Sequence, residues 1–282
     1  MINGRCYRMI CPLLLLSVLF LAAEGFLEEK PTVASKNLCR PDLCSPQMTH
    51  VGCIESKEFA PACGKGNRII FVNGGLRQSI LQSINIMRNY VASGVGNFSV
   101  AGRMPTMRWD TTLEKLASLL VRQCSIEGKY CANTEKYHYV STTQLSATME
   151  RRSNVARRVV NKLLPTLYHD LLGCHMDKDH RIMPLAEGVC VGHYIPLLQD
   201  NGNRMGCAIR YKSDQGGNDT ITLTLLCHFS RANVNSNPHY EVATIPGEKC
   251  STGKSKLYAF LCDRIEVVDA NNVGDIEGTA LF

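Results

Sequence analysis

The sequence predicts an α+β fold in which helices come first and an antiparallel hairpin follows late in the chain. Three observations lead to this prediction: helical periodicity recurs in the first half, two stretches of strand character lie within residues 204–229, and a glycine-rich turn separates them. No strand–helix–strand unit repeats along the chain. We therefore expect the helices to pack against the sheet rather than to cross between parallel strands.

The first residues have the features of a secretion signal. Arg5 and Arg8 precede an apolar run over residues 9–23, and small side chains follow where a signal peptidase can cut. The run is shorter than the roughly 20 apolar residues of a membrane helix, and no later stretch approaches that length. We expect residues 1–25 to be a cleaved signal peptide and the mature protein to be secreted, without a transmembrane segment.

Cysteine usage indicates an oxidising compartment. The chain has 14 cysteines, of which Cys6 and Cys11 lie in the expected leader, so an even set of twelve remains. Secreted chains can pair such a set completely, whereas cytosolic thiols stay reduced. The sequence alone does not choose among the connectivities. The twelve are Cys39, Cys44, Cys53, Cys63, Cys124, Cys131, Cys174, Cys190, Cys207, Cys227, Cys250 and Cys262.

The mature chain is predicted to open with a loop and a helix. Residues 37–66 are dense in Cys, Pro and Gly without helical periodicity, which predicts a loop held by disulfides. Residues 76–92 carry an apolar stripe at i, i+3, i+4 spacing, with Gly94 just beyond, and so predict a helix with one buried face. The stripe consists of Leu76, Ile80, Leu81, Ile84, Met87 and Val91.

A second helix is predicted to begin after Asp110. Thr111 and Glu114 have the spacing of a capping box, and an apolar face follows them as far as Cys124. This pattern places a disulfide cysteine in the last turn of the helix.

The remaining regular elements are one more helix and the hairpin. Residues 151–164 predict a third helix, which we expect Pro165 to interrupt. Residues 204–211 and 221–229 have strand character, and residues 214–219 supply the turn between them.

The last part of the chain is predicted to be a small appendage that begins beyond residue 235. It holds Cys250 and Cys262 and ends in an acidic tail, residues 263–282, which we expect to be mobile. Residues 247–255 imitate a phosphate-binding loop, but five residues instead of four separate the glycines, and no clear strand precedes them. We interpret this segment as an ordinary loop.

Composition and motifs exclude two classes of function. The formal net charge is +6, part of which leaves with the leader, so no strong basic field favours nucleic acid as a partner. The chain has neither a Gly-x-Ser-x-Gly motif nor a His-Glu-x-x-His motif. We therefore predict that the protein is not an enzyme and holds no cofactor.

Two polar clusters remain for interpretation. A solvated loop explains the first better than a metal site does, because its spacing matches no standard site. It consists of His169, Asp170, His175, Asp177, Asp179 and His180. The second is a basic face on the third helix, where solvation is the default and an acidic partner or a lipid surface is the alternative. It consists of Arg151, Arg157, Arg158 and Lys162.

Several phrases, in this order, resemble the cysteine-rich secretory, antigen 5 and pathogenesis-related (CAP) superfamily, and most of all its insect antigen 5-like branch. They are the Cys39 to Cys63 cluster, Ile80-Leu81, Arg88-Asn89, Gly94, Arg103-Met104, Met107, Trp109-Asp110, Leu113 to Ala117, Cys124, Cys131, Asn133-Thr134, Gly192-His193-Tyr194, Met205 to Ile209 and Leu226-Cys227. The resemblance implies an α-β-α sandwich, with a three-stranded antiparallel sheet between helices and a cleft on one side. It also implies a Cys-rich segment at 26–68, a CAP domain at 69–235 and the appendage at 236–282.

The resemblance further implies how the cysteines pair. The implied disulfides are Cys39–Cys53, Cys44–Cys131, Cys63–Cys124 and Cys207–Cys227, with Cys250–Cys262 in the appendage. Cys174 and Cys190 are then left for each other.

Family members often hold a divalent metal such as zinc with two histidines and two glutamates, and this chain departs from that set. Ile84 takes the place of the first histidine, and Gln144 takes the place of one glutamate. His193 remains, and the second glutamate has no counterpart that we can place. One imidazole does not make a zinc site, which generally needs three or four protein ligands, so we predict no metal there. His193 is expected to be a hydrogen-bonded cleft or core residue.

Three functions follow as hypotheses. The favoured one is a secreted, non-enzymatic protein that binds extracellular proteins or cell surfaces, for which seminal fluid (sperm or the female tract), saliva and venom are settings known for the family. The second is a carrier of sterol or another small lipid, and the third is a residual hydrolase that depends on His193. Sequons at Asn97 and Asn218 predict glycosylation along the secretory route.

Overall fold

The computed structural model describes residues 38–54, 56–125, 129–151, 154–184, 194–214, 216, 219–232 and 238–272. They belong to the compact unit Lys36–Phe282. The expected signal peptide, Cys190, His193 and the sequon at Asn218 lie outside the described residues.

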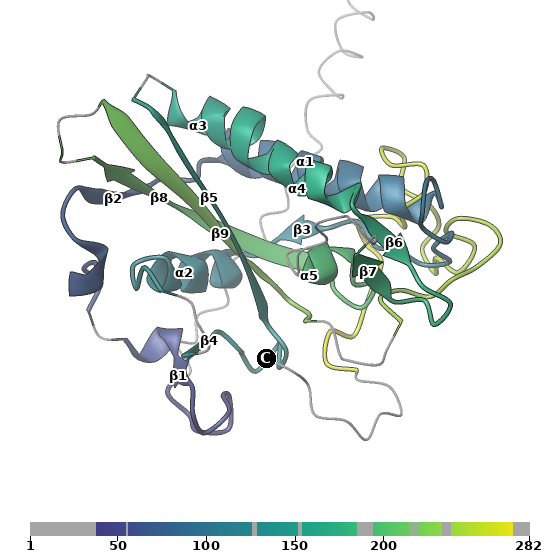
Figure 1. The fold of residues 1–282 in the computed structure, drawn as a ribbon. Coiled ribbons are helices and arrows are strands. Elements are labelled where there is room, and N and C mark those ends of the chain that lie inside the picture. Colours follow the sequence, from purple (N-terminus) through teal and green to yellow (C-terminus); the bar gives the residue numbers. More distant parts are fainter. Residues whose placement is uncertain are drawn as a thin grey trace, which may run out of the picture. The chain divides into compact units, whose positions relative to one another are not determined.

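The centre of the unit is a mixed sheet of five strands (Figure 1). Its order is β2 (Asn67–Ile70), β8 (Arg204–Ser213), β9 (Thr220–Phe229) and β5 (Ser141–Glu150), all antiparallel, and β3 (Arg108–Trp109) adds a parallel pair to β8. The hairpin β8–β9 confirms the two strands expected near the end of the chain. The expected number of strands was wrong, because the three long strands are extended by two short ones at β8.

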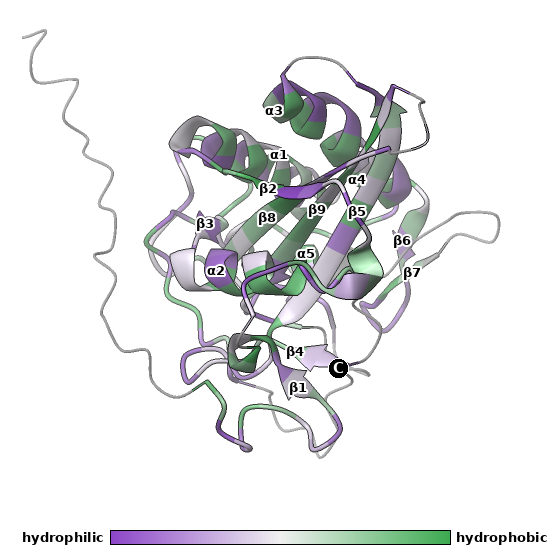
Figure 2. Ribbon diagram, turned by 90° about the vertical axis from the view of Figure 1, so that its left-hand side faces the viewer, coloured by the Kyte–Doolittle hydropathy of each residue, from purple (hydrophilic) through white to green (hydrophobic). Residues whose placement is uncertain are grey.

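Helices cover both faces of this sheet. Leu223, Leu225 and Cys227 of β9 pack into one cluster with α1 (Gly74–Ala92), α4 (Leu164–Leu171) and α5 (Tyr194–Leu198). Leu226 points the other way and packs with α2 (Thr111–Leu120). Successive side chains on a strand point to opposite faces, so apolar residues in an unbroken run are buried on both sides. Figure 2 shows the apolar strands between α1 and α2.

The helix α1 confirms the prediction from the apolar stripe. Asn73 caps its first turn by accepting the N–H of Leu76, and the stripe positions, apart from the half-buried Leu81, are buried. Beyond the helix, Gly94 has φ +70°, and a Cβ there would lie 2.5 Å from Val100 Cγ2. Glycine is therefore required where the chain leaves α1.

The helix α2 begins as predicted, but a different residue caps it. Asp110 accepts the N–H groups of Thr112 and Leu113, so Thr111 is the first helical residue rather than the cap. Glu114 instead accepts a hydrogen bond from Trp109 Nε1 at 2.8 Å. Cys124 lies beyond the end of the helix and is not part of its last turn.

The third helical stretch continues through Pro165, which corrects the predicted interruption. It runs as α3 (Val155–Arg158), a π-helical turn, η3 (Val159–Leu163), and α4. In that turn Leu164 N–H donates to Val159 O, five residues back. The hydrogen bonds therefore change from the four-residue to the five-residue spacing directly before Pro165, which has no N–H to donate. Pro165 thus stands in the first turn of α4, where a missing donor costs little.

Disulfides join the N-terminal segment to the rest of the unit. This segment contains β1 (Thr49–His50), η1 (Val51–Cys53) and η2 (Pro61–Cys63), and β1 pairs in parallel with β4 (Tyr130–Cys131). The disulfides found among the described residues are Cys39–Cys53, Cys44–Cys131, Cys63–Cys124, Cys207–Cys227 and Cys250–Cys262. These coincide with five of the pairs that the resemblance implied. Cys174 is also disulfide-bonded, although its expected partner, Cys190, lies outside the described residues.

The C-terminal appendage packs against the loop that follows α1. Cys262 N–H donates to Met104 O at 2.8 Å, Thr106 Oγ1 donates to Cys262 O at 2.6 Å, and Phe260 N–H donates to the side chain of Asn89 at 2.9 Å. Within the expected tail, residues 263–272 contact the unit through the buried Glu266 and Ala270. The rest of the tail, residues 273–282, lies outside the described residues.

Candidate functional site

A small apolar pocket lies between the sheet and the helices α1, α4 and α5. Its cavity volume is ≈ 10 Å³, which is about the space that one water molecule needs. The lining residues are Ile84, Thr143, Leu145, Leu164, Leu167, Leu197, Leu225, Cys227 and Phe229. Small-molecule sites usually occupy about 300–1,000 Å³, so this cavity is far smaller than the sites that hold a drug-sized or lipid ligand.

Ile84 gives the pocket its chemical character. Its side chain is 1% exposed and belongs to the main core cluster, together with Met87, as predicted. A hydrocarbon has no lone pair to offer a cation, and leucines of α4 and α5 line the wall opposite the sheet. The lining therefore suits apolar atoms and offers few groups that could polarise a substrate.

Gln144 does not share this pocket with Ile84, which corrects the assignment from sequence. In the β5–β9 register Gln144 pairs with Leu226, whose side chain packs with α2 on the other face of the sheet. The β5 residues that line the pocket are Thr143 and Leu145, which pair with Cys227 and Leu225. The polar residue of this strand that faces Ile84 is thus Thr143.

The described residues contain no group of three or more His, Cys, Asp or Glu side chains that could hold a metal ion. The polar cluster near Cys174 is occupied by internal contacts instead. Arg181 pairs with the carboxylates of Asp177 and Asp179, at 2.9 Å in each case. The backbone N–H of Arg181 also donates to Asp177 Oδ1, and these contacts together lower the pKa of Asp177. Two carboxylates of this loop are thus paired with Arg181.

The phrase around Ile84 has a structural role through two other residues, Asn85 and Arg88. Asn85 donates to Met107 O at 3.1 Å and accepts Met107 N–H at 2.7 Å. Arg88, which is fully buried, donates to the carbonyl oxygens of Pro105, Leu197, Gln199 and Gly202. Both side chains tie α1 to the loops that frame the pocket.

The charge of Arg88 is offset by carbonyl dipoles. Burial lowers the pKa of Arg88 to about 9, and the nearby Asp200 carboxylate acts in the opposite direction. Burial likewise raises the pKa of Asp200, which accepts Glu241 N–H at 2.8 Å. A buried cation is tolerated when its donors are all satisfied, so Arg88 acts as a brace and not as a surface site.

Buried histidines are a feature that sequence reasoning missed. His228 on β9 has Nδ1 2.9 Å from Thr142 Oγ1, and burial lowers its pKa to about 4. His239 Nδ1 accepts Ile182 N–H at 3.0 Å, and burial again lowers the pKa to about 4. No motif or periodicity marks either residue. Both imidazoles are neutral near pH 7 and hold backbone or strand contacts in place.

The basic face of the third helix is largely open to solvent. Arg151, Arg157 and Lys162 are exposed, whereas the guanidinium of Arg158 donates to Glu150 O. The sequon residue Asn97 is also exposed, on the turn after α1, and its carbonyl oxygen accepts Met176 N–H at 2.8 Å.

Together, the helix-covered sheet and the disulfides define a disulfide-braced domain of helices and sheet. A family model described as "CAP: Cysteine-rich secretory protein family" matches residues 81–229. The chain belongs to this family.

The chain is also similar to insect proteins of this kind along most of its length. It is 28% identical to Venom allergen-1 of Aedes albopictus, over 84% of this chain and 91% of the relative. It is 32% identical to Antigen 5 like allergen Cul n 1 of Culicoides nubeculosus, over 63% of this chain and 84% of the relative. Tabinhibitin 6 of Tabanus yao is 27% identical, over 93% of this chain and 97% of the relative.

A crystal structure of NaASP2 with Zn²⁺ has a similar fold. It aligns with a TM-score of 0.51 and 19% identity, over 68% of this chain and 96% of that chain. Within the described residues, no helix combines the length and the apolar character needed to cross a membrane.

Proposed function

We propose that the protein is a secreted, non-enzymatic CAP protein that binds an extracellular protein or cell surface and has lost the family's metal site. One observation carries the proposal: a fully buried isoleucine, Ile84, stands where the resemblance implies the first metal ligand. A zinc site generally needs three or four protein ligands, so the loss of one ligand lowers the affinity of the site for zinc steeply.

The composition of the pocket supports a binding role over catalysis. Among the residues that the structure describes, the lining holds Thr143 as a polar side chain and no carboxylate, imidazole or amine. The described histidines with a lowered pKa, His50, His228 and His239, form hydrogen bonds with backbone groups or with a neighbouring strand. A hydrolase needs a nucleophile and a base within hydrogen-bond reach of each other, and the described part of the lining offers no such pair.

Secretion is tested by expressing the full chain, including residues 1–25, in insect cells. We expect the product in the medium, cleaved near residue 25, with no titratable thiol in denaturant before reduction. Glycosidase treatment should increase its electrophoretic mobility, and Asn97→Gln should remove part of that shift. Asn97 contributes its backbone carbonyl to the fold, so this variant keeps the contact with Met176.

The lack of enzymatic activity is tested on the same product with peptide and ester substrates, with and without added zinc. We expect no turnover above that of a reduced, denatured sample. Turnover that His193→Ala abolishes would overturn the proposal in favour of a residual hydrolase.

The binding role is tested with extracts of secretory and reproductive tissues, by cross-linking to the oxidised protein and competing with excess unlabelled protein. A saturable, competed partner is the expected result. The same protein is titrated with labelled fatty acid and sterol. Stoichiometric uptake of either lipid that Ile84→Phe blocks would show carriage instead, because the added ring fills the pocket.

A further inference from the structure

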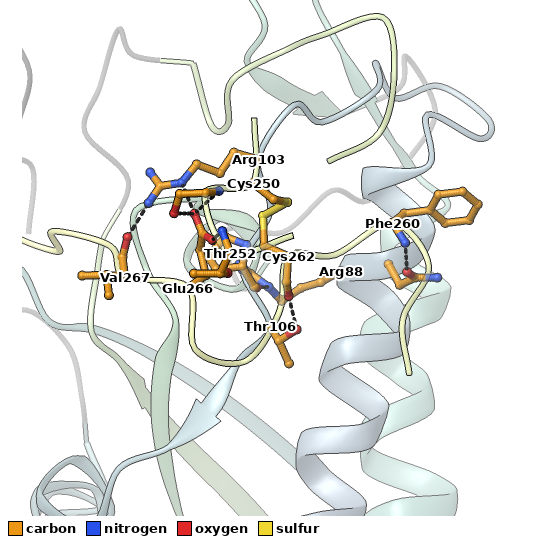
Figure 3. The surroundings of a disulfide bond; sticks show 12 residues. Arg88, Arg103, Thr106, Cys250, Thr252, Phe260, Cys262, Glu266 and Val267 are labelled. Atoms are coloured by element: carbon orange, nitrogen blue, oxygen red, sulfur yellow. Dashed lines mark hydrogen bonds and ion pairs between the residues drawn. A yellow bond between two sulfur atoms is a disulfide. The ribbon is translucent and has the colours of Figure 1, made fainter. Parts of the chain in front are cut away.

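In sequence, the turn of residues 247–255 resembles a phosphate-binding loop. In the structure, this turn binds a carboxylate of the same chain, that of Glu266. Gly247 and Gly253 have φ of 68° and 79°, a conformation that suits glycine. Cys250 ties the turn to Cys262. Ser251 and Thr252, between these fixed points, face the carboxylate of Glu266 (Figure 3).

The carboxylate of Glu266 is fully buried and surrounded by donors. The backbone N–H groups of Ser251 and Thr252 lie 3.2 and 2.9 Å from its two oxygens. The hydroxyls of the same residues donate at 2.9 and 2.5 Å, and Arg103 Nε donates at 2.9 Å. Consecutive N–H groups with hydroxyls and a guanidinium form the kind of concavity that binds oxyanions in proteins.

Glu266 fastens a longer segment to the unit. Arg103 also donates to Val267 O, and Asn203 Nδ2 donates to Glu266 O at 3.1 Å. Further along, the buried Arg231 donates to Ala270 O at 2.9 Å. We call residues 263–272 the C-terminal strap. Its carboxylate and carbonyl oxygens satisfy two arginines, and its removal would expose both of them.

We propose that the turn of residues 247–255 and Arg103 form a binding site for a small oxyanion such as a carboxylate, sulfate or phosphate. Glu266 fills this site as a tethered ligand, and the C-terminal strap closes it. The internal ligand stays charged in extracellular fluids. Burial raises the pKa of Glu266, but hydrogen bonds from Thr252, Arg103 and Ser251 outweigh burial and bring it to about 2.

The site is tested in the full, disulfide-intact chain with Glu266→Ala, which empties it. Acetate, sulfate and phosphate are titrated, with sodium chloride of equal ionic strength as the reference. In the variant we expect a saturable rise in the unfolding temperature of roughly 2–4 °C at anion concentrations several times the dissociation constant. The wild-type protein and the matched variant Glu248→Ala, which loses an exposed carboxylate at the start of the turn that is not among the donors to Glu266, should show no rise beyond the chloride reference.

A second variant distinguishes release of the C-terminal strap from a general loss of stability. Glu266→Gln keeps the shape of the side chain but presents an amide to the donors, so amide hydrogens of residues 263–272 should exchange faster than in the wild type. If Glu266→Ala does not fold, the exchange rates of Glu266→Gln decide the question. Unchanged exchange in the strap, or equal anion effects on wild type and variant, would contradict the proposal. Anion binding that survives Arg103→Ala in the Glu266→Ala background would also contradict it.

Discussion

Acidification from pH 7 to pH 5 is expected to destabilise the protein through its buried histidines. In the folded chain His228 and His239 have pKa values of about 4, against 6.5 for an unperturbed imidazole. Between these pH values the two imidazoles are largely protonated in the unfolded chain and neutral in the folded chain. The stabilising effect of the neutral, buried state is therefore complete above pH 6.5 and is lost as the pH falls toward 4.

The magnitude follows from linkage. A shift from 6.5 to about 4 gives about 2 kcal/mol of lost stability between pH 7 and pH 5 for each imidazole, hence about 4 kcal/mol for the two. His50 adds to the loss, because burial lowers its pKa as well. Asp200 acts in the opposite direction, since burial raises its pKa and protonation then favours the folded chain.

The assay is urea unfolding of the oxidised protein at pH 7 and pH 5, read as the free energy of unfolding. His228→Asn should reduce the difference between the two pH values by about 2 kcal/mol, even though the variant is less stable at both. His169→Gln, at an exposed position on α4, should leave the difference unchanged. Equal wild-type stability at the two pH values, or an equal effect of both variants, would refute the reasoning.

Three further predictions concern the frame of the pocket and are checked by the same unfolding measurement at pH 7. Arg88→Met removes a buried cation from its carbonyl cage and should cost about 3–5 kcal/mol, whereas the exposed Arg157→Met should cost less than about 0.5 kcal/mol. Gly206→Ala places a Cβ 2.1 Å from a backbone nitrogen of α2, so we expect little or no folded protein, while Gly74→Ala, with open space around it, should fold normally. Ile84→Ala should cost about 2–5 kcal/mol, because it leaves a larger cavity in the core.

The sequence was sufficient for elements with strong periodicity. The stripe of α1 predicted its extent to within two residues at the N-terminal end, and alternation predicted the hairpin β8–β9. By contrast, the interruption predicted at Pro165 was wrong. A helix with a π-helical turn tolerates a proline that a regular helix interior does not.

The site was harder to predict because it depends on register and on distant contacts. A shift of one residue along β5 decides whether Thr143 or Gln144 faces Ile84, and the pairing with β9 sets that register. Glu266 lies 163 positions from Arg103, so local pattern could not show that this part of the tail is bound.

Zinc titration of the oxidised, full-length protein by calorimetry tests the central claim most directly. The claim is that the pocket beside Ile84 no longer holds a metal. We expect no saturable binding and no difference between the wild type and His193→Ala. One zinc ion per chain, bound with an affinity that His193→Ala abolishes, would contradict the account.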